Sequence, residues 1–139
     1  FSGSFPHEIS HLSKLVLLDL TFNYGVYFNA TPMERLVRNL TSLREAFLNG
    51  VSMSNVALHS LSNFSSTLSN WTSPLKFLGI IKTRFLGELP NSIEGLESLE
   101  HLDLQGNFTG ELPNSIGNMV SLKWLTLAGY FTGSILELI

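Results

Sequence analysis

Residues 7–11 read His-Glu-Ile-Ser-His, which is the H-E-x-x-H pattern of a zinc metalloprotease. On an α-helix this spacing places both imidazoles on one face, one turn apart, where they can bind Zn²⁺. Glu8 would then act as the general base that activates a zinc-bound water. The pattern predicts a hydrolase only if the surrounding chain supplies that helix and a third ligand.

The composition narrows the possibilities. The 139 residues suit one domain, and a hydrophobic content of 44% is enough for a continuous core. The net charge of -3 gives no electrostatic reason to expect nucleic acid as a partner. The absence of cysteine excludes disulfides, thiolate metal sites and cysteine nucleophiles. No apolar run approaches the roughly 20 residues of a membrane helix, and no signal peptide is evident.

A leucine pattern recurs through the chain and sets the register of the other residues. The spacing L-x-x-L-x-L occurs in successive copies, with strand centres at Leu20, Leu48, Ile80, Leu104 and Leu127. It matches the leucine-rich repeat formula. The L-x-L step puts two apolar side chains on one face of a short strand. We therefore predict an α/β fold, a leucine-rich repeat solenoid with a curved parallel sheet on its concave face and short 3-10, helical and irregular segments on its convex face.

A second motif precedes the leucine pattern. Segments that begin at Phe1, Phe85, Phe108 and Phe131 share a glycine two residues later, where the chain turns away from the strand and a side chain would be in the way. The version F-T-G-E-L-P-N-S-I-G-N resembles the plant-specific, extracellular type of leucine-rich repeat. The stretch 36–56 resembles parts of plant receptor-like proteins, and the resemblance covers nearly the whole chain.

This resemblance implies a fragment of the ectodomain of a plant cell-surface receptor-like protein that binds a peptide or protein ligand, without catalysis or a cofactor. It also implies defence or developmental signalling together with a receptor-like kinase co-receptor, and a parent protein anchored by a membrane helix outside this sequence. Both ends stop within a repeat, so we expect isolated material to expose core and to self-associate. Two alternatives remain: a secreted inhibitor of a cell-wall-degrading enzyme, and a decayed paralogue without a ligand.

The chain 1–139 forms one domain of about five repeats with an insertion at 24–39 and a degenerate repeat at 58–74. In the insertion, the residues Thr-Pro-Met-Glu at 31–34 form a capping-box pattern with proline at the first helical position. This pattern predicts a short helix from about 32 to 38. Its inward-facing side chains are expected to be Met33, Leu36 and Val37.

The last two repeats are each one residue short between strand and turn. The stretches "LQGNFTG" and "LAGYFTG" lack a residue at or beside the position where the formula places Asn or Cys. The side chain at that position normally bonds to backbone groups of the next coil. We therefore expect looser stacking of the coils there.

The register also assigns the H-E-x-x-H residues to the surface. His7, Glu8 and His11 fall in columns that hold Asn, Ser and Gly in other copies, which are the variable, solvent-facing positions opposite the sheet. Pro6 directly before the motif and a strand that begins near residue 15 leave no room for a metalloprotease helix. We therefore expect no metal site and no enzyme.

Five Asn-x-Ser/Thr sequons occur, where chance gives about two. The excess favours passage through the secretory pathway, although a Ser- and Asn-rich chain also forms sequons by accident. The predicted N-glycosylation sites are Asn29, Asn39, Asn63, Asn70 and Asn107.

Side chains that flank the core leucines point outward from the predicted sheet and form three columns. The first column holds Leu17, Glu45, Phe77, His101 and Trp124. The second holds Asp19, Phe47, Gly79, Asp103 and Thr126, and the third holds Thr21, Asn49, Ile81, Gln105 and Ala128.

Aromatic side chains are concentrated in these columns. Adjacent strands lie roughly 4.8 Å apart, so Phe77, His101 and Trp124 would form a continuous exposed ribbon. Exposed aromatics clustered in this way favour a partner-binding surface, although scattered exposed apolar residues are ordinary. The residues predicted to contact a ligand are Glu45, Phe47, Phe77, Ile81, His101, Asp103, Gln105, Trp124 and Thr126.

Overall fold

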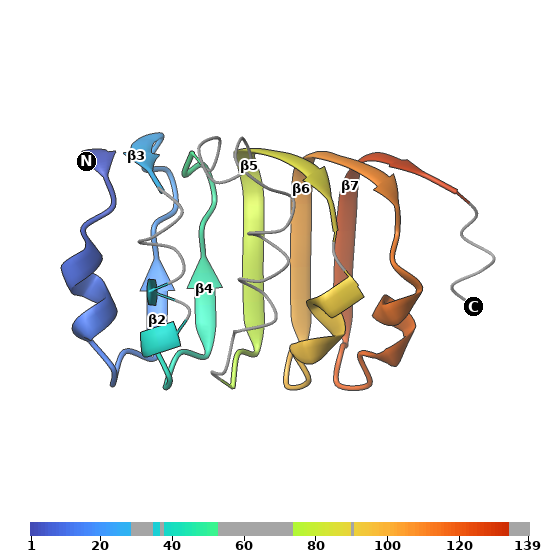
Figure 1. Ribbon diagram of the computed structural model, residues 1–139, viewed down its shortest axis with the longest axis horizontal. Helices are drawn as coiled ribbons and strands as arrows, with labels where there is room; N and C mark the ends of the chain where they lie inside the picture. Colours follow the sequence, from blue (N-terminus) through green and yellow to red (C-terminus); the bar gives the residue numbers. More distant parts are fainter. Residues whose placement is uncertain (29–34, 37, 53–73, 90, 134–139) are drawn as a thin grey trace.

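The computed structural model describes residues 1–28, 35–36, 38–52, 74–89 and 91–133. Its coils stand side by side along the long axis of the molecule, so that the first and last coils lie at opposite ends (Figure 1). No helix in these described stretches is long and apolar enough to cross a bilayer.

The main sheet is parallel and follows the chain order β2-β4-β5-β6-β7. Its strands are β2 (Leu17–Asp19), β4 (Glu45–Phe47), β5 (Phe77–Glu88), β6 (His101–Glu111) and β7 (Trp124–Thr132). The residues paired across it in successive strands are Leu17, Glu45, Phe77, His101 and Trp124. This is the register that the leucine spacing predicts, and the predicted leucine-rich repeat fold is confirmed.

A smaller parallel sheet joins β1 (Ser2–Ser4) to β3 (Gly25–Tyr27) at the edge of the first coils. Tyr27 also forms an isolated parallel bridge with Ser52. The backbone of the insertion therefore starts in contact with the neighbouring coils.

Short 3-10 helices lie between the strands: η1 (His7–His11), η2 (Asn91–Gly95) and η3 (Asn114–Asn118). Pro6 and Pro113 precede η1 and η3 with φ of -66° and -65°. A proline fixes that φ and has no N–H to satisfy, so it suits the first turn of a helix. The inward residue Ile116 is buried and accepts a backbone bond from Met119.

The core is built from the leucine columns. In the inner coils, the first position of L-x-L holds Ala46, Leu78 and Leu102, and the second position holds Leu48, Ile80 and Leu104. All six side chains are buried. In the last described strand, Leu125 is 41% exposed. Each coil therefore depends on its neighbours for burial, as a solenoid requires.

The described part of the predicted helix at 32–38 is helical. Residues 35–36 and 38–39 have helical conformation, and the backbone N–H of Leu40 donates to the carbonyl of Leu36. Leu36 is fully buried, as predicted. Met33 and Val37 lie outside the described residues, as does all of the degenerate repeat except residue 74.

The turn glycines act in two ways. Gly110 has φ of +77°, and a Cβ there would lie 2.6 Å from Cδ of Glu88. Gly3 has φ of +111° but open space around it, so its backbone conformation alone requires glycine. The predicted steric reason therefore holds at Gly110 and not at Gly3.

The shortened repeats do not have looser backbone pairing. β6 continues past the turn, and Asn107 and Phe108 pair with Leu86 and Gly87 of β5. Phe108 is fully buried, and its ring stacks on that of Phe131 at 6.1 Å. The shortened stretch stays extended and its backbone pairs with the neighbouring strand, as does β5, which keeps the full spacing with Thr83.

Candidate functional site: the concave aromatic ribbon

Four rings form a continuous stack across β4 to β7, which we call the aromatic ribbon (Phe47, Phe77, His101 and Trp124). Phe47 stacks on Phe77 with ring centroids 4.5 Å apart. Phe77 stacks on His101 at 5.5 Å, and His101 stacks on Trp124 at 6.1 Å. Parallel strands in register hold side chains of one column about 4.8 Å apart, which is the spacing of stacked rings.

The ribbon lies outside the core. Trp124 is 62% exposed, and Phe47, Phe77 and His101 are half-buried. The core leucines point to the other face of the same strands, because side chains alternate along a strand. The predicted exposed ribbon is thus present and includes Phe47 from the second column.

Gly79 explains how Phe47 joins the ribbon. It is the residue that pairs with Phe47 across the sheet. A Cβ on Gly79 would lie 3.2 Å from Cε1 of Phe77 and 3.2 Å from Oδ1 of Asn49. Both contacts would be tight, so glycine leaves the space in which the two phenylalanine rings meet.

Polar side chains beside the ribbon are oriented by hydrogen bonds within the same face. The Gln105 amide donates to Asp103 Oδ1 at 2.8 Å, and the Trp124 indole N–H donates to Thr126 Oγ1 at 3.2 Å. These bonds restrict the rotamers of groups that a ligand would meet. Fewer rotamers then have to be frozen when a partner binds.

At the N-terminal end of the sheet, the second and third columns begin with the polar residues Asp19 and Thr21. Asp19 is exposed, and its carboxylate accepts a backbone bond from Thr21 at 2.8 Å. The hydroxyl of Thr21 and then its backbone N–H lower the pKa of Asp19. Leu17 is 48% exposed, so the first column begins with an isolated apolar side chain.

All nine predicted ligand-contact residues lie in adjacent strands of one sheet. Glu45, Phe77, His101 and Trp124 share the first column, and Phe47, Asp103 and Thr126 share the second. The backbones of Ile81 and Gln105 pair in the third column. The geometry therefore unites the whole set, and their role in binding stays a prediction.

The H-E-x-x-H residues lie in η1, which is a 3-10 helix of five residues. With three residues per turn, positions i and i+4 do not lie directly above one another as they do in an α-helix. The imidazoles of His7 and His11 meet edge to face at 6.3 Å, and both are exposed. Among the described residues, no three His, Cys, Asp or Glu side chains gather where a metal could bind.

A charged column beside the ribbon was missed from the sequence. Nζ of Lys76 lies 3.1 Å from Oε1 of Glu100, and Nζ of Lys123 lies 2.7 Å from Oε2. These contacts, with the Lys123 hydrogen bond the strongest, lower the pKa of Glu100 to about 2. The available signal was the column itself, because each of these residues directly precedes a ribbon residue.

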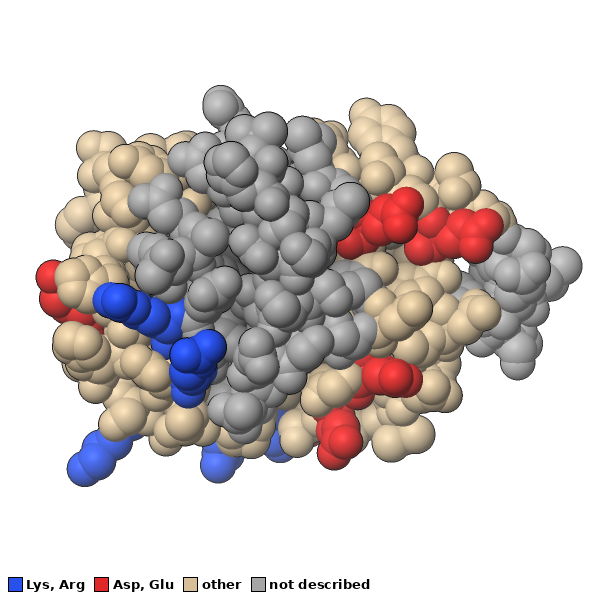
Figure 2. All heavy atoms as spheres, viewed as in Figure 1, with Lys and Arg blue, Asp and Glu red and all other residues tan. Residues whose placement is uncertain are grey.

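Charge is segregated along the solenoid. Seven of the eight Lys and Arg residues occur in 1–87, and seven of the eleven Asp and Glu residues occur in 88–139. On the side of the molecule that Figure 2 shows, the described Lys and Arg side chains lie toward one end and most of the Asp and Glu side chains lie toward the other.

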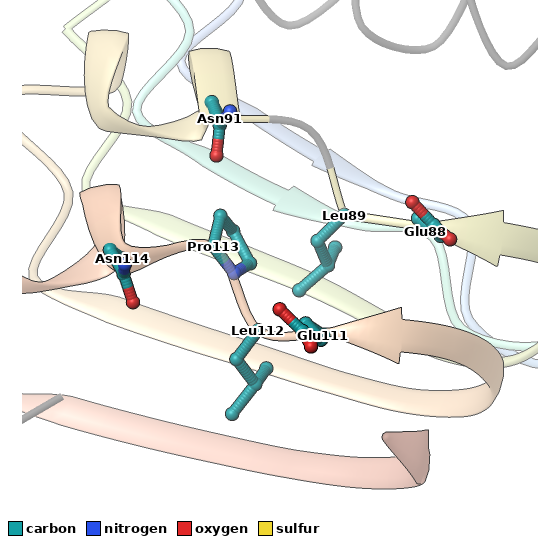
Figure 3. Close-up of a pocket in the computed structure, with 7 residues that line it drawn as sticks. All are labelled: Glu88, Leu89, Asn91, Glu111, Leu112, Pro113 and Asn114. Atoms are coloured by element: carbon teal, nitrogen blue, oxygen red, sulfur yellow. The ribbon is translucent and has the colours of Figure 1, made fainter. Parts of the chain in front are cut away.

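A hollow of about 520 Å³ lies away from the ribbon, between successive copies of the E-L-P-N motif (Figure 3). Its lining residues are Glu88, Leu89, Asn91, Glu111, Leu112, Pro113 and Asn114. It repeats the same side chains in two coils, with one glutamate, one leucine and one asparagine from each.

Comparison with known proteins agrees with the fold. Similar solved structures include the ectodomain of the Arabidopsis thaliana membrane receptor kinase GASSHO1/SCHENGEN3, with a TM-score of 0.65 and 26% identity over 93% of this chain and 14% of that chain. The Arabidopsis HAESA ectodomain aligns with a TM-score of 0.60 and 22% identity over 99% of this chain and 26% of that one. The fold is therefore that of a leucine-rich repeat solenoid.

Proteins of similar sequence identify the class of protein more closely. Receptor-like protein 9DC1 of Solanum pimpinellifolium is 40% identical over 107 residues, which cover 76% of this chain and 11% of the relative. Receptor-like protein Cf-9 of the same species is 38% identical over 103 residues, 73% of this chain and 11% of the relative. No known family's sequence profile matches the chain. The chain belongs to the plant receptor-like proteins of the Cf-9 family, and it spans about a tenth of the length of these relatives.

Proposed function

We propose that this chain is part of a ligand-binding ectodomain and recognises a peptide or protein through its concave face, without catalysis. The observation that carries the proposal is the aromatic ribbon, which exposes stacked rings across four adjacent strands. Large rings supply much of the contact energy at protein interfaces, and pre-stacked rings lose little conformational freedom on binding. The ribbon therefore suits a partner that binds against the concave face of the sheet.

Similar proteins support this use of the fold. The GASSHO1/SCHENGEN3 ectodomain was solved in complex with CASPARIAN STRIP INTEGRITY FACTOR 2. The proposed setting is the extracellular side of the plasma membrane, in a parent protein anchored by a membrane helix. Defence signalling with a receptor-like kinase co-receptor is the proposed role, because the chain is similar to Cf-9.

N-glycosylation forms part of this proposal. Asn39 and Asn107 are both exposed and are therefore accessible to the modifying enzyme. The remaining sequons, at Asn29, Asn63 and Asn70, lie outside the described residues. Glycans would add polar surface to a chain in which only 14% of residues are charged.

A binding experiment tests the proposal. The secreted 139-residue chain, isolated as a monomer by size-exclusion chromatography, is used to select linear peptides from a displayed library, and the selected peptide is then measured by biolayer interferometry. We expect Phe77→Ser and Trp124→Ser each to weaken binding at least about tenfold, as expected for central aromatic contacts.

The matched control is Val120→Gln, which adds a polar side chain without forming a new Asn-x-Ser/Thr sequon at Asn118. Val120 is 92% exposed and lies outside the three columns, so its loss should leave affinity unchanged. Equal affinity of the ribbon variants and the original chain, with circular dichroism showing that all are folded, would overturn the proposal.

A further inference from the structure

Three successive coils leave the concave sheet through a residue in the left-handed conformation. Phe22, Gly50 and Lys82 have φ of 63°, 83° and 54°. Each lies two residues after a core position, at Leu20, Leu48 and Ile80. A bulky residue other than glycine rarely adopts this conformation, and such strain is concentrated at functional sites.

A cavity of about 150 Å³ lies where these three turns meet, and we call it the rim pocket. It is lined by Thr21, Phe22, Tyr24, Asn49, Gly50, Ile81 and Lys82. The rings of Phe22 and Tyr24 are 6.2 Å apart and are 73% and 59% exposed. A Cβ on Gly50 would lie 2.8 Å from Cε1 of Tyr24, so glycine lets that ring lie close to the backbone.

The backbone around the rim pocket is already hydrogen-bonded. Phe22 N–H donates to the carbonyl of Asn49 at 3.0 Å, and Gly50 N–H donates to that of Ile81 at 2.7 Å. Ile81 N–H donates to Oδ1 of Asn49 at 3.2 Å. The pocket therefore offers apolar walls with few open backbone groups, which suits an apolar occupant.

Lys82 supplies the charge at this site. Its side chain is exposed, and within the described residues no carboxylate forms an ion pair with it. A carboxylate held beside the pocket would meet an uncompensated ammonium group. The occupant that matches both features has an aromatic ring next to an acidic group.

We propose that the rim pocket receives an aromatic side chain of an extended peptide, and that a neighbouring carboxylate of the same peptide pairs with Lys82. This inference rests on the proposed function. A cavity of about 150 Å³ is large enough for a benzene-sized group. The shared turn geometry accounts for the left-handed φ of Phe22, and a role as a pocket wall accounts for an exposed aromatic ring at that position.

The position of the pocket sets the spacing of the ligand. Ile81 follows Phe77 by four residues along β5, which is about 13 Å at 3.3 Å per residue. An extended peptide presents residues i and i+4 on one face. The ligand then has two large apolar side chains four positions apart, one on the aromatic ribbon and one in the rim pocket.

A pair of small probes tests the pocket on the 139-residue chain. Nuclear magnetic resonance titration with 3-phenylpropionate should shift the backbone amides of Phe22, Gly50 and Ile81. The neutral analogue 3-phenylpropan-1-ol should bind about two- to fivefold more weakly, the range expected for an exposed ion pair. Lys82→Asn should remove this difference, because asparagine tolerates the left-handed conformation and carries no charge.

Phe22→Asn separates binding from folding. It should weaken both probes at least about fivefold, because one wall is lost. It should also raise the thermal midpoint by about 2 to 5 °C, because asparagine relieves the strained conformation and no buried contact is lost. A purely structural Phe22 would lower the midpoint instead.

Other outcomes overturn the inference in distinguishable ways. Probe shifts confined to the aromatic ribbon, or unchanged affinity in Phe22→Asn, would exclude the rim pocket. A library peptide that loses binding in Trp124→Ser but not in Phe22→Asn would leave the proposed function standing and remove the pocket. A peptide insensitive to Trp124→Ser would remove the proposed function, while probe binding reports on the pocket separately.

Discussion

The coils around β2 and β4 differ from those around β5, β6 and β7 in how the chain turns away from the concave sheet. In the first coil, the Asn23 amide donates to the carbonyl of Leu20 at 3.1 Å and the strand ends after three residues. In the later coils the position of Asn23 either holds Thr83 or falls in a stretch that is one residue shorter, and the strands extend to between nine and twelve residues. A side chain stabilises the turn in one region, and backbone pairing does so in the other.

This difference shows that the asparagine of the repeat can be replaced by strand extension. A backbone group that loses its side-chain partner needs another one when it is buried. The later coils obtain it from the neighbouring strand, with shifts of register after Ile81 and Gln105. The extended strands also bring Phe108 and Phe131 together, whereas in the first coils Phe5 meets Phe28, with ring centroids 4.4 Å apart.

The largest expected effect comes from Phe108. Phe108→Ala should lower the free energy of unfolding by about 3–5 kcal/mol, because the ring is fully buried and leaves a cavity. Chemical denaturation monitored by circular dichroism measures this change. Phe22→Ala is the matched control, because the Phe22 ring is exposed. A similar loss of unfolding free energy in both variants would show that the extended strands do not depend on the Phe108 ring.

Substitutions at Asn23 and Asn107 compare the side-chain turn of the first coil with the backbone pairing of the later coils. Asn23→Ala should cost about 1–2 kcal/mol, because the Leu20 carbonyl loses its bond from the side chain. Asn107→Ala should change stability by less than about 0.5 kcal/mol, since the exposed Asn107 takes part in pairing through its backbone. The same denaturation measurement on unglycosylated protein tests both, and equal losses would refute the division between side-chain and backbone turns.

Gly110 tests the geometry of the extended region. Gly110→Ala should destabilise the fold by about 1–2 kcal/mol through its positive φ, and more if the Glu88 side chain cannot move. Gly117→Ala serves as the control, because Gly117 has open space around it and no positive φ. Thermal unfolding of the two variants gives the difference, and a Gly110→Ala variant as stable as Gly117→Ala would contradict the described turn.

The smallest effect concerns the column of Lys76, Glu100 and Lys123. The folded pKa of Glu100, about 2, is below the ordinary value of 4.5. Its contribution is therefore present above pH 4.5 and is lost as the pH falls toward about 2. Thermal midpoints across that range should fall less steeply for Glu100→Gln, and added salt should reduce the difference because the groups are partly exposed. Parallel pH profiles for both proteins would contradict this.

The sequence predicts the concave register because a solenoid repeats one coil geometry, so leucine spacing alone aligns Phe77, His101 and Trp124. It does not predict the strand extension at Asn107. A missing residue indicates a lost bond, whereas the new backbone partner lies on another coil. The rim pocket was missed because composition does not encode the left-handed φ of Phe22, although a glycine at the equivalent position, Gly50, was an available signal.

The separation of charge between the two ends of the solenoid gives the molecule a permanent electrical polarity along its length. In an external field, or beside a charged macromolecule, such a body experiences a torque before any atoms touch. Its approach is then biased toward one direction, and the bias weakens once the distance exceeds the Debye length of about 8 Å at physiological ionic strength. Diffusional encounters would therefore begin with the long axis already oriented.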